Sequence, residues 1–147
     1  MPIVQRILSV FSHHAPAPLP EPDARLALGA LLVRVAKSDA TYRVEEIARI
    51  DRILAAANDL NAVEAAKMRA TCEKLEKQAP ETERFAALIR ETVAHEGRLE
   101  KLRALWQVTL ADGLERPEEI GVIDTVREAL GLSPEDNAAA RAAAEEG

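Results

Sequence analysis

Aromatic residues and cysteines are scarce in this chain of 147 residues. Aromatic side chains make up only 3% of the sequence, whereas hydrophobic residues as a whole make up 48% and are mainly Ala and Leu. This composition favours helices packed by aliphatic side chains over strands, which are enriched in aromatic and β-branched residues. Cys72 is the only cysteine. No intramolecular disulfide can therefore form, which fits a reducing compartment, and we predict a cytoplasmic location.

Long apolar runs and an excess of basic residues are also missing. No apolar run reaches the roughly 20 residues that a transmembrane helix needs. The net charge of -6 lacks the basic footprint of a nucleic-acid-binding protein. An acidic surface suits cations or basic partners, or simply keeps the protein soluble. We therefore predict no nucleic-acid partner and no stable membrane insertion, and we expect a protein partner.

The N-terminal residues 1–21 differ from the rest of the chain. The apolar residues of Ile3–Phe11 are interrupted by polar ones, which indicates an amphipathic helix rather than a signal peptide. The prolines of Pro16–Pro22 indicate an extended connector of polyproline type. We predict an amphipathic segment and a Pro-rich linker over 1–21. We expect this segment to dock on its own domain, and the alternatives are docking on a partner or peripheral association with a membrane. One helical domain follows over 22–147, long enough to bury a core.

One pattern occurs twice: an apolar helix, a short acidic turn and a second helix. The first copy is Leu32–Ile47 and the second is Leu105–Ile120. When one is placed on the other without gaps, Leu, Val, Asp, Arg, Glu, Glu and Ile coincide. A fixed offset over so many identities indicates an internal repeat.

Four acidic residues occupy equivalent places in this repeat. Asp39 and Asp112 each extend an apolar stripe at the C-terminal end of a helix, where the helix dipole disfavours a carboxylate by roughly 0.3–1 kcal/mol. In the helix that follows each turn, Glu46 and Glu119 align with apolar residues, whereas Glu45 aligns with arginines and is predicted to face water. We predict that the other four acids face inward and meet.

A purely structural interpretation of these acids stays open. A Glu in the first helical turn is a common partner of the helix dipole. An Asp before a turn often accepts hydrogen bonds from the backbone N–H groups that follow it. The repetition of the pattern favours a site, but it does not exclude simple capping.

Several residues predict where helices begin and end. Asn61 and Glu64 have the spacing of a capping box. Pro117 suits the first position of a helix, Gly131 suits the residue after a helix end, and Ser133 suits an N-cap.

Two further features concern helix interiors. Gly29 lies within a predicted helix and would allow another helix to approach closely, and Cys72 lies on an apolar stripe as a small core residue. The pattern weakens around His95–Gly97, where we expect a break.

The sequence resembles the tellurite-resistance TerB-like family. The resemblance rests on Ala111–Gly113 followed by Glu118 and Glu119, on the preceding Leu105–Val108, and on the tail Leu130–Asp136. It covers roughly residues 20–143.

This resemblance implies an all-α fold, a compact bundle of about seven helices built from two related helix-turn-helix halves. It also implies a metal site formed by Asp39, Glu46, Asp112 and Glu119. Ala40 stands where the family usually has Gly, so the first turn is expected to differ from the second.

The kind of ion follows from the ligand type. Carboxylates, backbone carbonyls and water favour Ca²⁺, Mg²⁺ or Mn²⁺ over Zn²⁺ or Cu. The loop after Asp112 lacks the further acids of an EF-hand. A di-iron bundle needs Glu-x-x-His pairs on two helices, but Glu91 precedes His95 by four positions.

Signals of catalysis are absent from the sequence. It has no phosphate-binding Gly loop, no Gly-x-Ser-x-Gly and no Cys/His pair in register. We predict a non-enzymatic, divalent-cation-binding module linked to tellurite or stress response. The alternative is a metal-free protein-interaction scaffold resembling a co-chaperone, and a metal-dependent hydrolase is the least favoured hypothesis.

Overall fold

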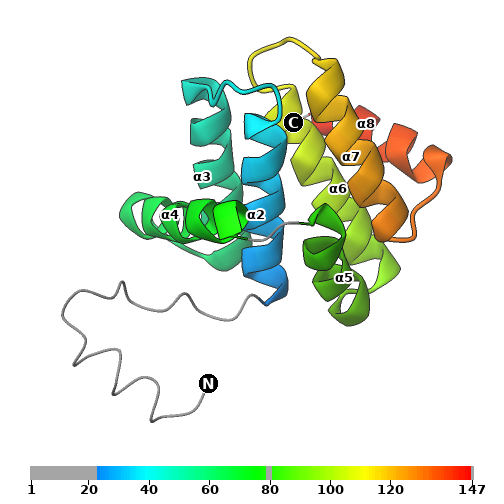
Figure 1. The fold of residues 1–147 in the computed structure, drawn as a ribbon, viewed down its shortest axis with the longest axis horizontal. Coiled ribbons are helices and arrows are strands. Elements are labelled where there is room, and N and C mark those ends of the chain that lie inside the picture. Colours follow the sequence, from blue (N-terminus) through cyan, green and yellow to red (C-terminus); the bar gives the residue numbers. More distant parts are fainter. Residues whose placement is uncertain (1–22, 79–80, 147) are drawn as a thin grey trace.

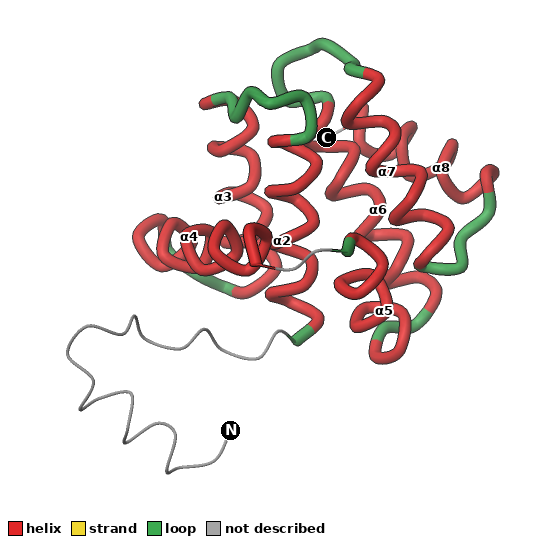
Figure 2. Tube along the Cα trace, in the orientation of Figure 1, coloured by secondary structure: helices red, strands yellow, loops and turns green. Residues whose placement is uncertain are grey.

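A computed structural model describes residues 23–78 and 81–146, which form seven α-helices and no strand (Figures 1 and 2). The helices are α2 (Ala24–Lys37), α3 (Val44–Asn58), α4 (Ala62–Gln78), α5 (Thr82–Thr92), α6 (His95–Thr109), α7 (Pro117–Ala129) and α8 (Pro134–Glu146). The predicted all-α fold class is confirmed. The descent of both halves from one repeated unit stays a prediction, and the predicted N-terminal segment and linker, 1–21, lie outside the described residues.

Helix α2 is the centre of the bundle. Figure 1 shows it between α3 and α6, with α4 crossing it, and α2 also packs against α5 and α7. Every residue from Ala27 to Val33 is buried, as are Val35 and Ala36. A helix that is apolar on all sides must be enclosed by others, so the composition of this segment determines its central position.

The helices around α2 bury one stripe each. Along α3 the buried residues are Glu46, Ile50 and Leu54, which follow one another at intervals of four. Along α7 they include Glu119 and Ile123. Each of these two stripes therefore begins with a glutamate in the first helical turn, and the rest of the stripe is apolar.

The predicted helix ends are largely confirmed. The Glu64 amide donates to Asn61 Oδ1 at 2.8 Å and the Asn61 amide donates to Glu64 Oε1 at 3.0 Å, which completes the capping box. Helix α7 begins at Pro117, and Gly131 follows it with a φ of 72°. The expected break falls slightly earlier than predicted, because Val93 and Ala94 separate α5 from α6 and residues 95–97 are already helical.

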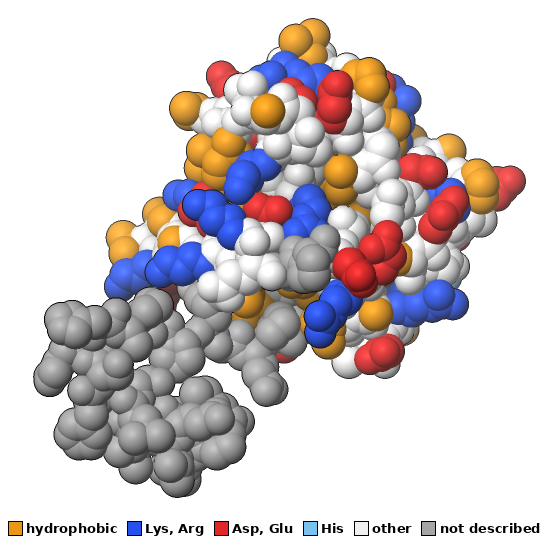
Figure 3. Space-filling view, viewed as in Figure 1, with side chains coloured by type: hydrophobic (Ala, Val, Ile, Leu, Met, Phe, Trp, Pro, Cys, Tyr) orange, Lys and Arg blue, Asp and Glu red, His pale blue; other side chains and the backbone are white. Residues whose placement is uncertain are grey.

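The described surface mixes charges of both signs. On the face drawn in Figure 3, Lys and Arg side chains lie among Asp and Glu side chains. The large hydrophobic residues exposed on the described surface are Val44, Val63 and Leu114. Among the described helices, none has both the length and the apolar character needed to cross a bilayer.

Gly29 allows α2 and α4 to cross closely. A Cβ atom at this position would overlap the Sγ atom of Cys72, which is fully buried in the core. Burial raises the pKa of the Cys72 thiol to about 12. Both predictions are confirmed: the glycine permits a helix contact, and the cysteine is a core residue.

We predict that Gly29→Ala lowers the free energy of unfolding by about 1–3 kcal/mol because it overpacks this crossing. Urea unfolding measures the change, and adding Cys72→Ala should recover much of it. Gly121→Ala is the matched control, since nothing lies within 4 Å of a Cβ atom there, and it should gain up to about 1 kcal/mol from helix propensity. An equal response at both glycines would contradict the close crossing.

Candidate functional site

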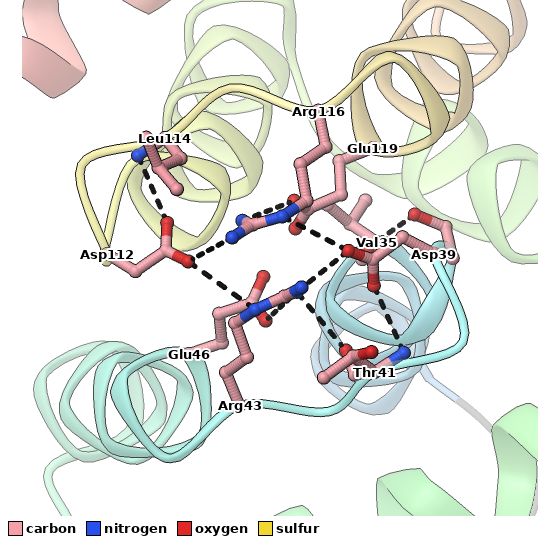
Figure 4. A network of polar contacts seen from close by, with 10 residues as sticks. Val35, Asp39, Thr41, Arg43, Glu46, Asp112, Leu114, Arg116 and Glu119 are labelled. Atoms are coloured by element: carbon pink, nitrogen blue, oxygen red, sulfur yellow. Dashed lines mark hydrogen bonds and ion pairs between the residues drawn. The ribbon is translucent and has the colours of Figure 1, made fainter.

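The two acidic turns lie at the same end of the molecule. The turn 38–43 joins α2 to α3 and the turn 110–116 joins α6 to α7, and both are at the top of Figure 1. Helix α2 packs against α3, α6 and α7, and α6 packs against α3 and α7. This packing brings the four predicted acids into one cluster (Figure 4). We call Asp39, Glu46, Asp112 and Glu119 the carboxylate cluster.

The two turns have the same backbone geometry. The Ala40 amide donates to the Lys37 carbonyl at 2.9 Å, and the Gly113 amide donates to the Leu110 carbonyl at 3.0 Å. Ala40 has a φ of 69° and Gly113 has a φ of 80°. The expected difference at Ala40 therefore does not arise, because the alanine adopts the left-handed conformation at a cost of roughly 1–2 kcal/mol.

Each aspartate uses its two oxygens differently. Oδ1 of Asp39 accepts from the Thr41 amide at 3.1 Å, and Oδ1 of Asp112 accepts from the Leu114 amide at 3.2 Å. The structural interpretation that the sequence left open is thus correct for this oxygen. Oδ2 of each aspartate instead contacts arginine side chains, so the aspartates stabilise their turns and also face the cluster.

Arg43 and Arg116 bridge the aspartates across the two turns. Arg43 Nη1 lies 2.8 Å from Asp39 Oδ2, and its Nε lies 3.6 Å from Asp112 Oδ2. Arg116 Nη2 lies 2.7 Å from Asp112 Oδ2, and its Nε lies 3.2 Å from Asp39 Oδ2. Figure 4 shows the two guanidinium groups between the aspartates. Each arginine therefore contacts the acid of its own turn and that of the other.

These ion pairs hold the aspartates in their charged form. The hydrogen bond from Arg116, with that from the Leu114 amide, keeps the pKa of Asp112 below its usual range. Burial acts to raise the pKa of Asp39, but hydrogen bonds from Arg43 and the Thr41 amide outweigh it and the net shift is downward.

The sequence-based prediction missed both arginines as members of the site. They occupy the N-cap positions of α3 and α7 and make no side-chain capping hydrogen bond. N-caps strongly favour Ser, Thr, Asp or Asn, and the positive end of the helix dipole disfavours a cation. Arg43 and Arg116 also coincide in the internal repeat. An arginine at the same unfavourable position in both copies is the signal that could have identified them.

Glu46 and Glu119 lie fully buried beneath the arginines, while Glu45 is exposed as predicted. Arg43 Nη1 lies 3.6 Å from Glu46 Oε1, and Arg116 Nη1 lies 3.5 Å from Glu119 Oε2. Both oxygens of Glu46 and Oε1 of Glu119 have no hydrogen-bond partner. Burial, together with the neighbouring carboxylate of Glu46, raises the pKa of Glu119 to about 9. This shift favours the protonated form of Glu119.

The residue types of the cluster fit a hard cation, but their arrangement is not a ready-made metal site. Fully ionised, the four carboxylates would exceed the two guanidinium groups by two negative charges, but the raised pKa of Glu119 opposes the ionisation of one of them. Three buried carboxylate oxygens lack hydrogen-bond partners. Yet no three acidic, His or Cys side chains in the described part of the chain are grouped to hold a metal ion. Arginine side chains lie between the aspartates and supply part of the counter-charge.

Comparison with known protein families shows to which family the chain belongs. A family profile described as "Tellurite resistance protein TerB" matches residues 25–142. The chain belongs to the TerB family. The matched region contains both turns and the whole carboxylate cluster. Searches of curated proteins and of solved structures gave no match to this TerB-family chain.

Glu119→Gln should remove a pH dependence of stability in this TerB-family protein. The pKa of Glu119 is raised from 4.5 to about 9, so the unfolded chain loses this proton first. The contribution of Glu119 is therefore complete below about pH 4.5 and declines as the pH rises towards about 9. Glutamine resembles the protonated acid, so the variant should melt at a higher temperature than wild type at about pH 8, with a smaller gap at about pH 5.

Melting curves across this pH range provide the measurement. Glu118→Gln is the matched control, because Glu118 is the exposed neighbour of Glu119 on the same helical turn. It should follow the wild-type pH profile. Parallel profiles for Glu119→Gln and wild type would show that Glu119 ionises normally in the folded protein.

Proposed function

We propose that this TerB-family chain is a non-enzymatic module that binds one divalent cation at the carboxylate cluster. The observation that supports this most directly is the set of buried carboxylate oxygens without hydrogen-bond partners on Glu46 and Glu119. Such oxygens are costly to bury unless a positive group satisfies them. Once Glu119 has lost its proton, a divalent ion would supply the two positive charges that balance four carboxylates against two arginines.

The chemistry of the cluster suggests which ion binds and what limits its affinity. All-oxygen donors favour Ca²⁺, Mg²⁺ or Mn²⁺. Arg43 and Arg116 repel a cation, and the proton on Glu119 has to leave before that oxygen can act as a full ligand. Cation affinity should therefore be moderate and should rise with pH. Bound in this place, the ion would hold the two turns together.

We propose the biological role from the family match. The description of the TerB family supports a role in tellurite resistance or a related stress response. We place the protein in the cytoplasm, where the helical module would present its surface to a protein partner. In this proposal the segment 1–21 docks on its own domain or on a partner, or associates peripherally with a membrane.

A metal-free protein-interaction scaffold is the second candidate. Arg43 and Arg116 already bridge both aspartates, so the turns are held together without an ion. Val44 and Leu114 lie on the α3 and α6–α7 sides of this end and are 76% and 60% exposed. Their apolar side chains would contact a partner beside the cluster.

Thermal melting with Ca²⁺, Mg²⁺ or Mn²⁺ tests the cation proposal. An ion at a hundred times its dissociation constant adds about 2.7 kcal/mol, or about 10 °C in a chain of this size. Asp112→Asn should reduce the shift strongly. Asp59→Asn is the matched control, because this exposed residue ends α3 in a left-handed conformation that asparagine tolerates. It should leave the shift unchanged.

Arg116→Gln separates the two candidates. If the cluster binds a cation, the wild-type protein should bind the ion, and the variant should bind it more tightly because a positive charge has been removed. If the cluster is a metal-free ion-pair network, wild type should show no shift with millimolar amounts of any of the three ions. Arg116→Gln would then only lower the melting temperature. This second outcome would overturn the cation proposal and favour the scaffold.

A further inference from the structure

A pocket of about 410 Å³ lies between α3 and α6, and one residue of α2 also lines it. Its apolar lining includes Leu28 from α2, Ile53 from α3 and Ala104 from α6. None of its lining residues belongs to the carboxylate cluster. The volume falls within the range of pockets that hold small organic ligands.

Three arginines line this pocket without acidic partners. Arg49 and Arg52 come from α3 and Arg103 comes from α6. Within residues 23–78 and 81–146, none of the three side chains makes an ion pair or a hydrogen bond, and Arg103 Nε is buried with no acceptor. Lys101 and Glu100 also line the pocket, so its lining carries four positive charges against one negative charge.

This arrangement is unfavourable for folding by itself. Burial, and then the charges of Arg52 and Arg103, lower the pKa of Arg49. Several other arginines of the protein are paired with acids: Arg69 lies 2.6 Å from an acidic oxygen, and Arg127 lies 3.0 Å from another. In a chain with a net charge of -6, acids to neutralise such a group are plentiful. The unpaired cluster beside a pocket is therefore the arrangement expected of an anion site.

We propose that this pocket binds a small organic phosphate monoester, with the phosphate held by Arg49, Arg52 and Arg103. Guanidinium groups donate in pairs to phosphate oxygens, and three of them match a dianionic group better than a single negative charge. The apolar part of the ligand would lie against Leu28 and Ile53. This site is independent of the proposed cation site, so either can fail without the other.

Calorimetric titration of the full chain with phenyl phosphate tests the proposal. Phenyl phosphate should bind, and inorganic phosphate should bind more weakly because it has no apolar part. Arg49→Gln and Arg103→Gln should each weaken binding by about tenfold or more, as expected for hydrogen bonds to a charged group. Their melting temperatures should stay equal or rise, because each substitution removes like-charge repulsion.

Arg84→Gln is the matched control, because Arg84 is exposed on α5 and does not line the pocket. It should bind phenyl phosphate as wild type does. Phthalate, which carries its two charges on carboxylates, tests the phosphate assignment, and tighter binding of phthalate would overturn it. An absence of heat with millimolar phenyl phosphate would overturn the site, as would equal weakening by Arg84→Gln and Arg49→Gln.

Discussion

The reciprocal bridge between two arginines and two aspartates is the interaction on which this end of the molecule depends. Arg43 and Arg116 each contact both Asp39 and Asp112, so the turns of the two helix pairs are joined by charge-assisted contacts. The arginines occupy helix N-caps, where their side chains do not make the capping hydrogen bond that Ser, Thr, Asp or Asn would make. They lie above buried carboxyl groups whose negative charge would otherwise be uncompensated. This electrostatic contact explains why arginines occupy N-cap positions that the helix dipole disfavours for a positive charge.

Packing around the central helix α2 brings the two acidic turns close enough for these contacts. Because α2 is apolar on all sides, five helices pack around it, and the ends of α2 and α6 that carry the acidic turns come to lie together. Close packing extends to the crossing with α4, where Gly29 leaves room for Cys72. The aliphatic core thus fixes the frame rigidly enough for carboxyl groups on four different segments to share one small volume.

Much of this could be predicted from local patterns, and one error shows where such patterns fail. Helical periodicity predicts the all-α fold class and the inward orientation of Glu46 and Glu119. Helix-capping preferences predict the capping box at Asn61. Both kinds of pattern involve only a few consecutive residues. The expectation that Ala40 would alter its turn was wrong. Backbone propensity was overridden there, because the hydrogen bonds and ion pairs of the turn outweigh the strain of one left-handed alanine.

The sequence by itself determined the helices, their buried faces and the equivalent positions of the four acids, because helical periodicity is a property of consecutive residues. Only the tertiary structure decided that both arginines bridge the turns, that Glu119 lies beside Glu46 with a raised pKa, and that Arg49 and Arg103 share a pocket. Those outcomes depend on distances between residues on different helices. Such distances are set by how the apolar faces pack, which no local pattern specifies.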